Sequence, residues 1–439
     1  MRNPIIANQH SANPVDYKKK LFPLFLVIAI VFIGFISLKK NTPAPAEQGL
    51  SSLAFADPAK SDIPIVQVFV PGFSVKEIPL NLTNINALRY GPDGRLYGLA
   101  YDGHIYVLTD TDGDGVEDKA VYWWDKSVII SPVGMVVAKE GIYVTSKDKV
   151  SLIKDTDNDG IGDKEEILTK DWVHPFVYTG TSTNGVDAFG IARDKNGDIY
   201  FALGTADFTN AFSIDSTGKS HYDIKSERGT VLRLTPGSSK REMVCTGTRF
   251  PVAMAFNSHG DLFATDQEGA TWLPNGNPLD ELLQIQTGRH YGFPPRHPKF
   301  LPNVIDEPSV FDYSPQHQST CGLNFNVPIN GGPVFGPAWW QDDAFVSGYS
   351  RGKIYRTTLV KTPAGYVAEN SLFASVAALT VDACVSPKGD MVISTHSGSP
   401  DWGYGPQANG KLYKVIYTKA IAKPCNSMVF KIRPGKHRF

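Results

Sequence analysis

The chain has few cysteines and almost no net charge, and both shortages exclude classes of protein. Its 439 residues include four cysteines, which are Cys245, Cys321, Cys384 and Cys425. No C-x-x-C pair occurs, which excludes a c-type haem attached within this chain and leaves a zinc ribbon without support. Four cysteines allow three disulfide pairings, among which the sequence does not choose. The formal net charge is only −1, so we expect no nucleic-acid partner.

One long hydrophobic run stands near the start of the chain. Residues 21–38 carry no charge, and lysines flank them at 18–20 and at 39–40. Such a run is long enough to cross a bilayer as a helix, and the greater positive charge before it favours an N-in orientation. We therefore expect a transmembrane signal anchor at 21–38 in a bacterial inner membrane, with the part of the chain that follows it facing the periplasm or the cell exterior. A signal peptide cleaved near 54–56 is the alternative.

The sequence on either side of this run divides into distinct segments. Residues 1–20 form a polar stub, which an N-in anchor places in the cytoplasm. Residues 39–63 include many Pro, Ala and Ser residues, and we expect them to act as a flexible tether. The hydrophobic content of 42% and the aromatic content of 11% fit a globular domain, which we place at 64–418. Residues 419–439 form a basic tail.

A polar turn followed by a short apolar strand recurs six times along the globular region. The copies begin at Pro92, Lys139, Lys195, Ser258, Gln341 and Pro387. Each copy has one apolar face that is too small to be buried alone, so neighbouring copies must stack around an axis. The pattern predicts an all-β fold, a six-bladed β-propeller preceded by a single transmembrane helix. Residues 66–70 are expected to complete the last blade, and a β-sandwich with similar hairpins is the alternative fold.

Two acidic loops follow strand-like segments within this region. Their carboxylates belong to Asp110, Asp112, Asp114 and Asp118 in the first loop, and to Asp155, Asp157, Asp159 and Asp163 in the second. Oxygen ligands at positions 1, 3, 5 and 9 around a glycine are those that calcium requires. The second loop also has Glu166 at position 12, whereas the first has Val121 there, which predicts a weaker or differently completed site. We expect structural calcium sites, and solvated acidic turns are the alternative.

A longer pattern lies in residues 246–294. It reads, in order, G-x-R-x-P, an apolar strand, G-x-L-F-x-T-D, an acidic loop with glycine, D-E-L and G-x-x-Y-G-F-P. The order and spacing resemble those of the soluble quinoprotein glucose dehydrogenase, aldose sugar dehydrogenase and sorbosone dehydrogenase family of six-bladed propellers. The repeat pattern extends this resemblance over residues 64–418.

This resemblance implies a pyrroloquinoline quinone (PQQ) site on one face of the propeller, with a calcium ion that polarises the quinone. It implies that the planar guanidinium of Arg249 contacts a carboxylate or quinone oxygen of the cofactor. Asp266 and Glu268 of the acidic loop are expected to help hold that region, and Tyr291 belongs to the same motif. Lys353 lies where the family has a cationic contact to the cofactor.

The chain departs from the family pattern at two places. The family's Arg-Asn pair is Arg249-Phe250 here, which removes one amide contact to the cofactor. The family's general base is a histidine in an H-x-G-G-type stretch, and the equivalent run at 181–189 contains no histidine. Asn184 cannot accept a proton near neutral pH, so Asp187 is the candidate base in this run if burial raises its pKa.

A second stretch, at residues 395–406, offers another candidate base. It resembles a signature of the sorbosone-dehydrogenase-like, membrane-bound subgroup of these propellers. On this loop His396 could serve as a base, Asp401 as its carboxylate partner and Trp402 as a stacking surface. The candidate catalytic residues are therefore His396, Asp187 and Asp401. A loop histidine bonded to the backbone is the alternative for His396.

The first functional hypothesis is a membrane-anchored, extracytoplasmic oxidoreductase. It would carry out PQQ-type oxidation of a sugar or alcohol on a propeller with calcium-stabilised loops, and would pass electrons to a separate cytochrome c or quinone acceptor. The second is a non-catalytic, calcium-stabilised propeller that binds glycans or protein partners. A hydrolase or isomerase is a third and weaker alternative. The fold alone does not decide among them, since propellers host many unrelated functions.

Overall fold

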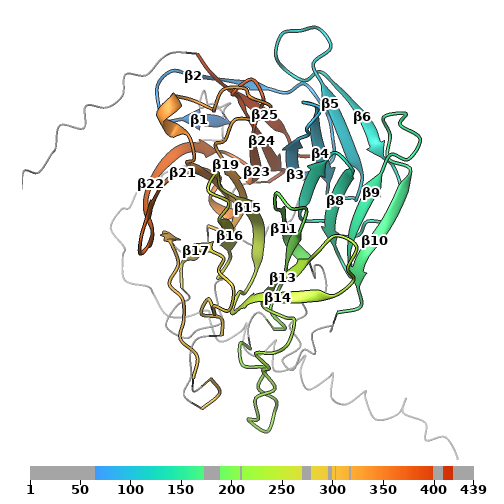
Figure 1. Cartoon of the computed structure of the whole chain (residues 1–439). Coiled ribbons are helices and arrows are strands. Elements are labelled where there is room, and N and C mark those ends of the chain that lie inside the picture. Colours follow the sequence, from blue (N-terminus) through green and yellow to red (C-terminus); the bar gives the residue numbers. More distant parts are fainter. Residues whose placement is uncertain are drawn as a thin grey trace, which may run out of the picture. The chain divides into compact units, whose positions relative to one another are not determined.

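The computed structural model describes residues 65–172, 188–207, 210–268, 278–294, 299–301, 303–315, 318–398 and 409–418. In this part of the chain six antiparallel sheets are arranged as blades around a common centre (Figure 1). The structure therefore confirms the all-β, six-bladed propeller. No helix among the described residues is long and apolar enough to cross a membrane, and residues 21–38 lie outside them.

The first three blades follow one another along the chain, and each has four strands that succeed one another from the centre of the ring outward. The first blade has β3 (Ile85–Tyr90), β4 (Leu96–Ala100), β5 (Ile105–Thr109) and β6 (Lys119–Trp124). The second has β7 (Met135–Ala138), β8 (Gly141–Ser146), β9 (Lys149–Lys154) and β10 (Lys164–Lys170). The third has β11 (Ala188–Arg193), β12 (Ile199–Leu203), β13 (Thr230–Leu234) and β14 (Arg241–Thr246).

The remaining three blades complete the ring. The fourth has β15 (Pro251–Phe256), β16 (Leu262–Asp266), β17 (Asp280–Gln284) and β18 (Phe311–Tyr313). The fifth has β19 (Thr320–Phe325), β20 (Ala344–Gly348), β21 (Lys353–Thr362), β22 (Gly365–Val376) and the added strand β1 (Val66–Val68). The sixth has β23 (Leu379–Val385), β24 (Met391–His396), β25 (Leu412–Tyr417) and β2 (Phe73–Glu77). Two short 3-10 helices, η2 (Ala338–Trp340) and η3 (Tyr349–Arg351), flank β20.

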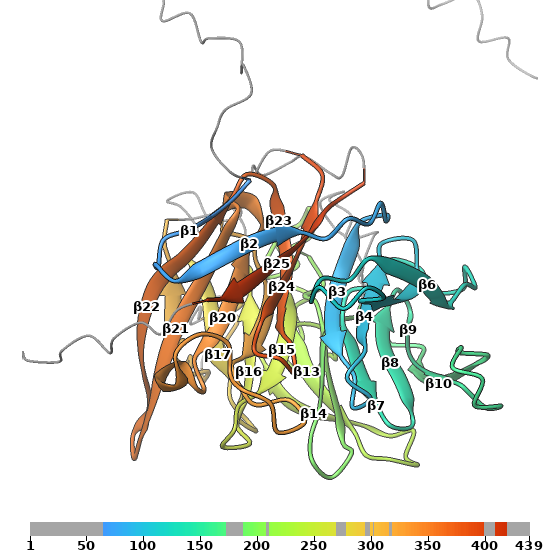
Figure 2. The same ribbon diagram turned by 90° about the horizontal axis from the view of Figure 1, so that it is seen from above.

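Strands from the two ends of the folded region close the ring. β2 pairs antiparallel with β25, so the sixth blade takes its outer strand from the N-terminal side of the propeller (Figure 2). β1 pairs with β22 instead and extends the fifth blade. The expectation that residues 66–70 complete the last blade is therefore wrong, because the β2 strand that follows occupies that edge.

The six repeated turns occupy equivalent positions in the ring. Each joins the inner strand of a blade to its second strand, as between β3 and β4 or between β23 and β24. Because neighbouring strands are antiparallel, these turns lie on the same face of the ring as the connections from third to fourth strand, which include both acidic loops. We call this the turn face. The opposite face, which carries the connections between blades, is the mouth face.

The chain enters the described part of the propeller on the mouth face. Val66 pairs with Val376, the last residue of β22, and the carbonyl of Ile65 accepts a hydrogen bond of 2.8 Å from the amide of Ala377. Ala377 belongs to the connection from the fifth to the sixth blade, which defines that face. Ile65 therefore lies at the same end of the ring as the loops between blades.

A buried ion pair holds the first and sixth blades together near the point of closure. Lys414 on β25 donates hydrogen bonds of 3.0 and 3.1 Å to the two carboxylate oxygens of Glu117, and the hydroxyl of Tyr90 donates to Glu117 at 2.9 Å. The side chains of Lys414 and Glu117 are 4% and 7% exposed. A charge in such a place depends on its partner, since an unpaired buried ion costs several kcal/mol.

This pair gives a stability prediction. Replacing Lys414 by Met should lower the free energy of unfolding by about 3 kcal/mol, because Glu117 is left buried without its cation. The double variant Lys414→Met/Glu117→Leu should recover most of that loss, since no unpaired charge remains. Urea unfolding of the full-length protein measures both. Lys411→Met, which removes the exposed Lys411–Glu77 pair, is the matched control and should change little; a Lys414 variant no worse than this control would contradict the prediction.

Candidate functional site

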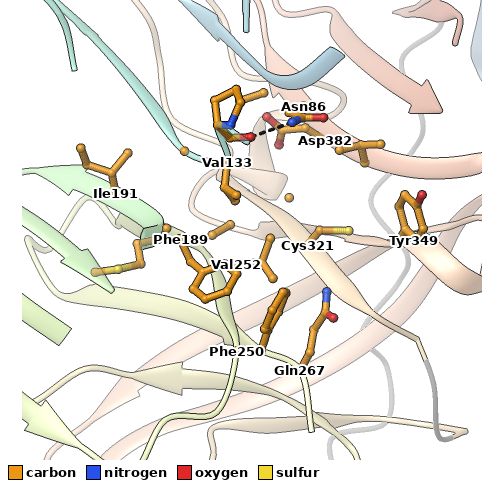
Figure 3. Close-up of a pocket in the computed structure, with 18 of the residues that line it drawn as sticks. Asn86, Val133, Phe189, Ile191, Phe250, Val252, Gln267, Cys321, Tyr349 and Asp382 are labelled. Atoms are coloured by element: carbon orange, nitrogen blue, oxygen red, sulfur yellow. Dashed lines mark hydrogen bonds between the residues drawn. The ribbon is translucent and has the colours of Figure 1, made fainter. Parts of the chain in front are cut away.

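A cavity of about 370 Å³ opens in the centre of the ring toward the mouth face. Inner strands β3, β11, β15, β19 and β23 line it, together with the connection that leads into β7. The apolar part of its wall comes from Ala87, Val133, Phe189, Ile191, Phe250, Val252, Met254 and Cys321. The labelled side chains of this set lie around a common space in Figure 3. A pocket of this size and lining suits a small organic molecule.

Phe250 shows how a departure from the family motif builds this wall. Its ring packs against that of Phe189, with 4.0 Å between ring centroids (Figure 3). The residue that replaces the family's asparagine thus covers part of the cavity with an aromatic surface. Small residues in the inner strands let the blades approach closely, since a Cβ added at Gly322 would lie 2.4 Å from Oδ1 of Asp382.

The polar end of the cavity centres on His396, the last residue of β24. Its Nε2 lies 2.9 Å from Oδ1 of Asn86, and its Nδ1 lies 3.4 Å from the hydroxyl of Tyr349. The side chain is 6% exposed, and burial lowers the pKa of His396 to about 4. The imidazole is therefore neutral at neutral pH and carries a lone pair that can accept a proton.

The charges that line the cavity balance one another. Nη1 of Arg89 lies 2.6 Å from Oδ2 of Asp382, and the same oxygen accepts a hydrogen bond of 2.9 Å from the amide of Leu88. Burial raises the pKa of Asp382, while the nearby guanidinium opposes that shift. With His396 neutral and Arg89 paired, the described wall of the cavity has no surplus of positive charge.

A second group of titratable residues lies in the fourth blade. Asp266, Glu281 and Asp312 stand opposite one another on β16, β17 and β18, so three carboxylates form a row across the sheet. Directly opposed like charges destabilise a sheet. We call Asp266, Glu281 and Asp312, with Glu268 and Asp280 beside them, the carboxylate row.

Part of this row has a structural task. Asp266 is buried and accepts hydrogen bonds from the backbone amides of Arg249 at 2.8 Å and Phe250 at 2.6 Å. Asp280 is also buried and accepts from the amides of Glu268 and Thr320, both at 3.0 Å. These bonds fix the path of the chain into β15 and β19, and they satisfy the two aspartates without a ligand.

Glu281 is less well satisfied than the two aspartates. Burial raises the pKa of Glu281 and of Glu268 well above the usual value, and the neighbouring carboxylates raise both further. Oε2 of Glu281 is buried and has no hydrogen-bond partner among the described residues. Burial also raises the pKa of Asp266, to about 6. Among the described residues, Arg249 is the cation whose charge acts on this group, and one guanidinium cannot neutralise five carboxylates.

The carboxylate row fits the calcium that the family resemblance implies. Calcium binds hard oxygen ligands, and a divalent cation would supply the charge that the row lacks. Glu281 is the residue that would hold it, because its Oε2 is buried without a hydrogen-bond partner among the described residues, whereas Asp266 and Asp280 already accept backbone amides. Such an ion would lower the pKa values of the row and stabilise the fourth blade.

The two acidic loops lie on the turn face, away from the cavity mouth. The carboxylates of Asp110, Asp112 and Asp114 lie within 4.8 Å of one another, and so do those of the second loop's triplet. That triplet comprises Asp155, Asp157 and Asp159. At position 9 the carboxylate accepts hydrogen bonds from the loop's own threonine, as Asp118 does from Thr111. An ion bound here would be too remote to act on a molecule in the cavity, which agrees with the structural role that the sequence predicts.

The remaining ligands predicted for these loops are occupied by other contacts. Asp163 accepts from the hydroxyl of Thr156 at 2.7 Å, as its counterpart in the first loop does. Glu166 forms an exposed pair with Lys154, with 2.6 Å between Oε2 and Nζ. Lys76 of the sixth blade lies 3.1 Å from Asp114.

The structure brings one of the predicted catalytic residues to the cavity. His396 lines it, whereas Asp187 and Asp401 lie outside the described residues. Trp402 also lies outside them. The imidazole bonds to Asn86, far away in sequence, so the alternative of a loop histidine bonded to the backbone does not describe it.

The predicted cofactor residues do not line the cavity. Arg249, Asp266 and Glu268 belong to the surroundings of the carboxylate row. Lys353 lies at the mouth-face end of β21 with its Nζ 5.9 Å from the centre of the Tyr355 ring. The hydroxyl of Tyr291 donates to the carbonyl of Gln284 and accepts from a neighbouring amide, a structural role inside a hydrophobic cluster.

Sequence reasoning missed Asn86, Tyr349 and the Arg89–Asp382 pair. Asn86 and Arg89 are polar residues within the inner strand β3, and this is the local sign that could have indicated them. Tyr349 stands next to the Ser-Arg-Gly-Lys run that contains Lys353. Their importance comes from convergence at the centre of the ring, which depends on contacts between distant blades.

The fold and the site together define a six-bladed propeller with a central small-molecule cavity. Residues 85–314 match the model of a family described as a domain of unknown function (DUF7133), and the chain belongs to that family. No curated protein matches the chain.

Solved structures share the fold at low sequence identity. The PQQ-bound aldose sugar dehydrogenase from Streptomyces coelicolor is 16% identical, with a TM-score of 0.55 over 78% of this chain and 98% of that one. The apo-form soluble aldose sugar dehydrogenase from Escherichia coli is also 16% identical, with a TM-score of 0.55 over 79% and 99%. The holo PQQ domain of a pyranose dehydrogenase from Coprinopsis cinerea is 10% identical, with a TM-score of 0.57 over 80% and 97%. The fold predicted from the family resemblance is thus confirmed.

The described wall of the cavity does not fit PQQ. This cofactor carries three carboxylates, which must lose water on entering a pocket and need cations or hydrogen-bond donors in exchange. The cavity offers Arg89, which Asp382 already neutralises, and a neutral His396. Phe250 fills the position of an amide donor in the family.

The carboxylate row gives a prediction about calcium. Replacing Glu281 by Gln should raise the stability of the calcium-free protein at pH 7.5 by on the order of 1 kcal/mol, because a carboxyl group whose ionisation is disfavoured by burial is replaced by a neutral amide. The folded-state pKa of Glu281 is raised, so its contribution to stability is greatest at low pH and is lost as the pH rises through that value. Thermal unfolding with EDTA and with calcium measures the effect.

The same variant should lose part of the stabilisation that calcium gives to the wild-type protein. Glu77→Gln, at an exposed side chain on β2, is the matched control and should respond to calcium as the wild type does. A Glu281 variant that is less stable than the wild type in EDTA, with an unchanged calcium response, would show that the row binds no cation.

Proposed function

We propose that the chain is a dehydrogenase-like propeller that binds an uncharged alcohol with a largely apolar body in its central cavity. The observation that carries this proposal is the lining of that cavity, an apolar wall with one polar end at His396. The wall would contact the body of the alcohol, and the polar end would receive its hydroxyl group. The fold shared with sugar dehydrogenases supports the reaction class.

The lining favours an alcohol over a sugar. Each hydroxyl group that enters an apolar site without a hydrogen-bond partner costs about 1–3 kcal/mol. A free sugar has several hydroxyl groups, whereas most of the cavity wall is apolar. Its polar side chains are mainly Asn86, Tyr349 and His396 at one end, Gln267 at another, and Arg89 and Asp382, which pair with each other. An alcohol with one hydroxyl group matches that distribution.

His396 would take the proton in such a reaction. Oxidation of an alcohol removes one proton from oxygen and one hydride from carbon. A neutral imidazole at the polar end can accept the proton from a hydroxyl group bound beside it. The hydride would pass to a separate two-electron oxidant such as a quinone, which would be reduced to the hydroquinone.

PQQ-dependent oxidation of a sugar is the second candidate function. The likeness in fold to a PQQ-bound aldose sugar dehydrogenase favours it, and the charge balance of the cavity weighs against it. If the protein does oxidise its ligand, a separate cytochrome c or quinone would receive the electrons. A non-catalytic propeller that binds glycans or protein partners is the alternative to both.

Calcium and a membrane anchor complete the proposal. We place structural calcium at the two acidic loops and a further ion at the carboxylate row, supported by the clustered carboxylates of the loops and by the raised pKa values of the row. The apolar run at 21–38 supports a transmembrane anchor in a bacterial inner membrane, with the propeller facing the periplasm or the cell exterior.

A ligand panel tests the proposal on the full-length protein. Cyclohexanol should shift the melting temperature saturably and glucose should not, because the cavity matches a single hydroxyl group on an apolar body. The variant Val252→Phe, which fills part of the cavity, should abolish the shift. Val360→Phe, at an exposed site on β21, is the control and should leave the shift unchanged.

Titration with PQQ in the presence of calcium separates the candidates. Saturable PQQ binding, followed by reduction of a dye on adding glucose, would contradict the alcohol-binding proposal and support PQQ-dependent oxidation of a sugar. Binding of neither cyclohexanol nor PQQ would favour the non-catalytic alternative.

A further inference from the structure

A chain of hydrogen bonds runs from the backbone of the second blade to the imidazole of the sixth. Nδ2 of Asn86 donates to the carbonyl of Pro132 at 2.7 Å, and this bond is the dashed line in Figure 3. Oδ1 of the same amide lies 2.9 Å from Nε2 of His396. Asn86 stands on β3 and Pro132 precedes β7, so three separate segments meet here.

This chain of contacts fixes the roles of its atoms. A backbone carbonyl only accepts hydrogen bonds, so the Asn86 amide must turn its NH₂ group toward Pro132 and its oxygen toward His396. The amide oxygen also only accepts, so Nε2 of His396 must carry the proton. In a neutral imidazole the other nitrogen, Nδ1, then carries the lone pair.

The surroundings of the ring keep that lone pair at the polar end of the cavity. The rings of Tyr101 and Tyr349 pack edge-on against the imidazole, with centroids 6.1 and 5.7 Å away. Nδ1 faces the hydroxyl of Tyr349 at the long distance of 3.4 Å. Besides these tyrosines, the titratable and charged groups of the described cavity wall are Asp382, Arg89 and the buried thiol of Cys321.

We propose that Asn86 is a positioning residue that holds His396 in the Nε2-protonated tautomer, so that Nδ1 accepts a hydrogen bond from the hydroxyl group of the cavity ligand. The ligand part of this proposal rests on the proposed function, whereas the tautomer does not. A hydroxyl group can donate to Nδ1 and accept from Tyr349. A ketone or aldehyde can only accept, so the single hydroxyl proton of Tyr349 must go either to it or to Nδ1, and one of these two acceptors is left without a donor. The cavity should therefore bind an alcohol more tightly than the carbonyl compound of the same shape.

The tautomer can be tested directly on the wild-type protein. Nitrogen-15 NMR of the histidine-labelled full-length protein at pH 7 distinguishes protonated from unprotonated ring nitrogens, and the His396→Gln variant assigns the signals. We expect Nε2 to be protonated and Nδ1 to be unprotonated. The opposite tautomer would overturn the proposal, whatever the ligand is.

The ligand preference can be tested with cyclohexanol and cyclohexanone. The wild-type protein should bind the alcohol roughly three- to tenfold more tightly, the value of one hydrogen bond. In Asn86→Asp the carboxylate stabilises a protonated ring with N–H groups at both nitrogens, so Nδ1 becomes a donor and the preference should fall to about one or reverse. Calorimetric titration of both compounds measures the ratio.

The ratio separates positioning from a merely structural role. If Asn86 only stabilised the fold, the Asn86→Asp variant would bind both compounds more weakly by the same factor. The ratio of their affinities would then be unchanged, which would overturn the proposal. Asn257→Asp, where the amide serves a turn of the fourth blade, is the matched control and should keep the wild-type preference. Correct tautomers with no binding of either compound would reject the alcohol as ligand while leaving the role of Asn86 in place.

Discussion

Six sheets with apolar faces can bury those faces only by stacking in a closed ring, and this ring closes when β2 from the N-terminal side pairs with β25. The other features of the molecule depend on that closure. It brings the first and sixth blades together over the buried pair of Lys414 and Glu117. It also brings Asn86 of β3 to His396 of β24, which are 310 positions apart in the chain. The polar end of the cavity exists only once the ring is complete.

The blades were predictable from the sequence because each one contains the same local motif, a polar turn between its first two strands. The repeated turns need a residue with positive φ, and Gly94 and Gly260, at φ of 79° and 78°, provide it in the first and fourth blades. The choice of edge for the N-terminal strands was not predictable in this way. Both β1 and β2 are short segments that suit an outer strand. Only the packing of the fifth and sixth blades decides that β1 pairs with β22 and β2 with β25.

The site was predictable in part for the same reason. His396 stands out in the sequence because a long loop follows its strand, and the family motif draws attention to Arg249. The partners that define the chemistry of the cavity carry no such signal. Asp382 is 293 positions from Arg89, and their pairing neutralises the guanidinium that lines the cavity. Phe250 marks the loss of an amide in the sequence, yet its contribution to an apolar wall requires its contact with Phe189.

Ile65 enters the ring on the mouth face, beside the loops among which the cavity opens. The preceding segment is therefore attached at the end of the propeller through which a ligand would pass. With an anchor at 21–38, as we propose, the residues between it and Ile65 would allow a separation of at most roughly 90 Å from the bilayer. An apolar alcohol partitions into lipid, so such an anchor would keep the cavity within that distance of a reservoir of its ligand.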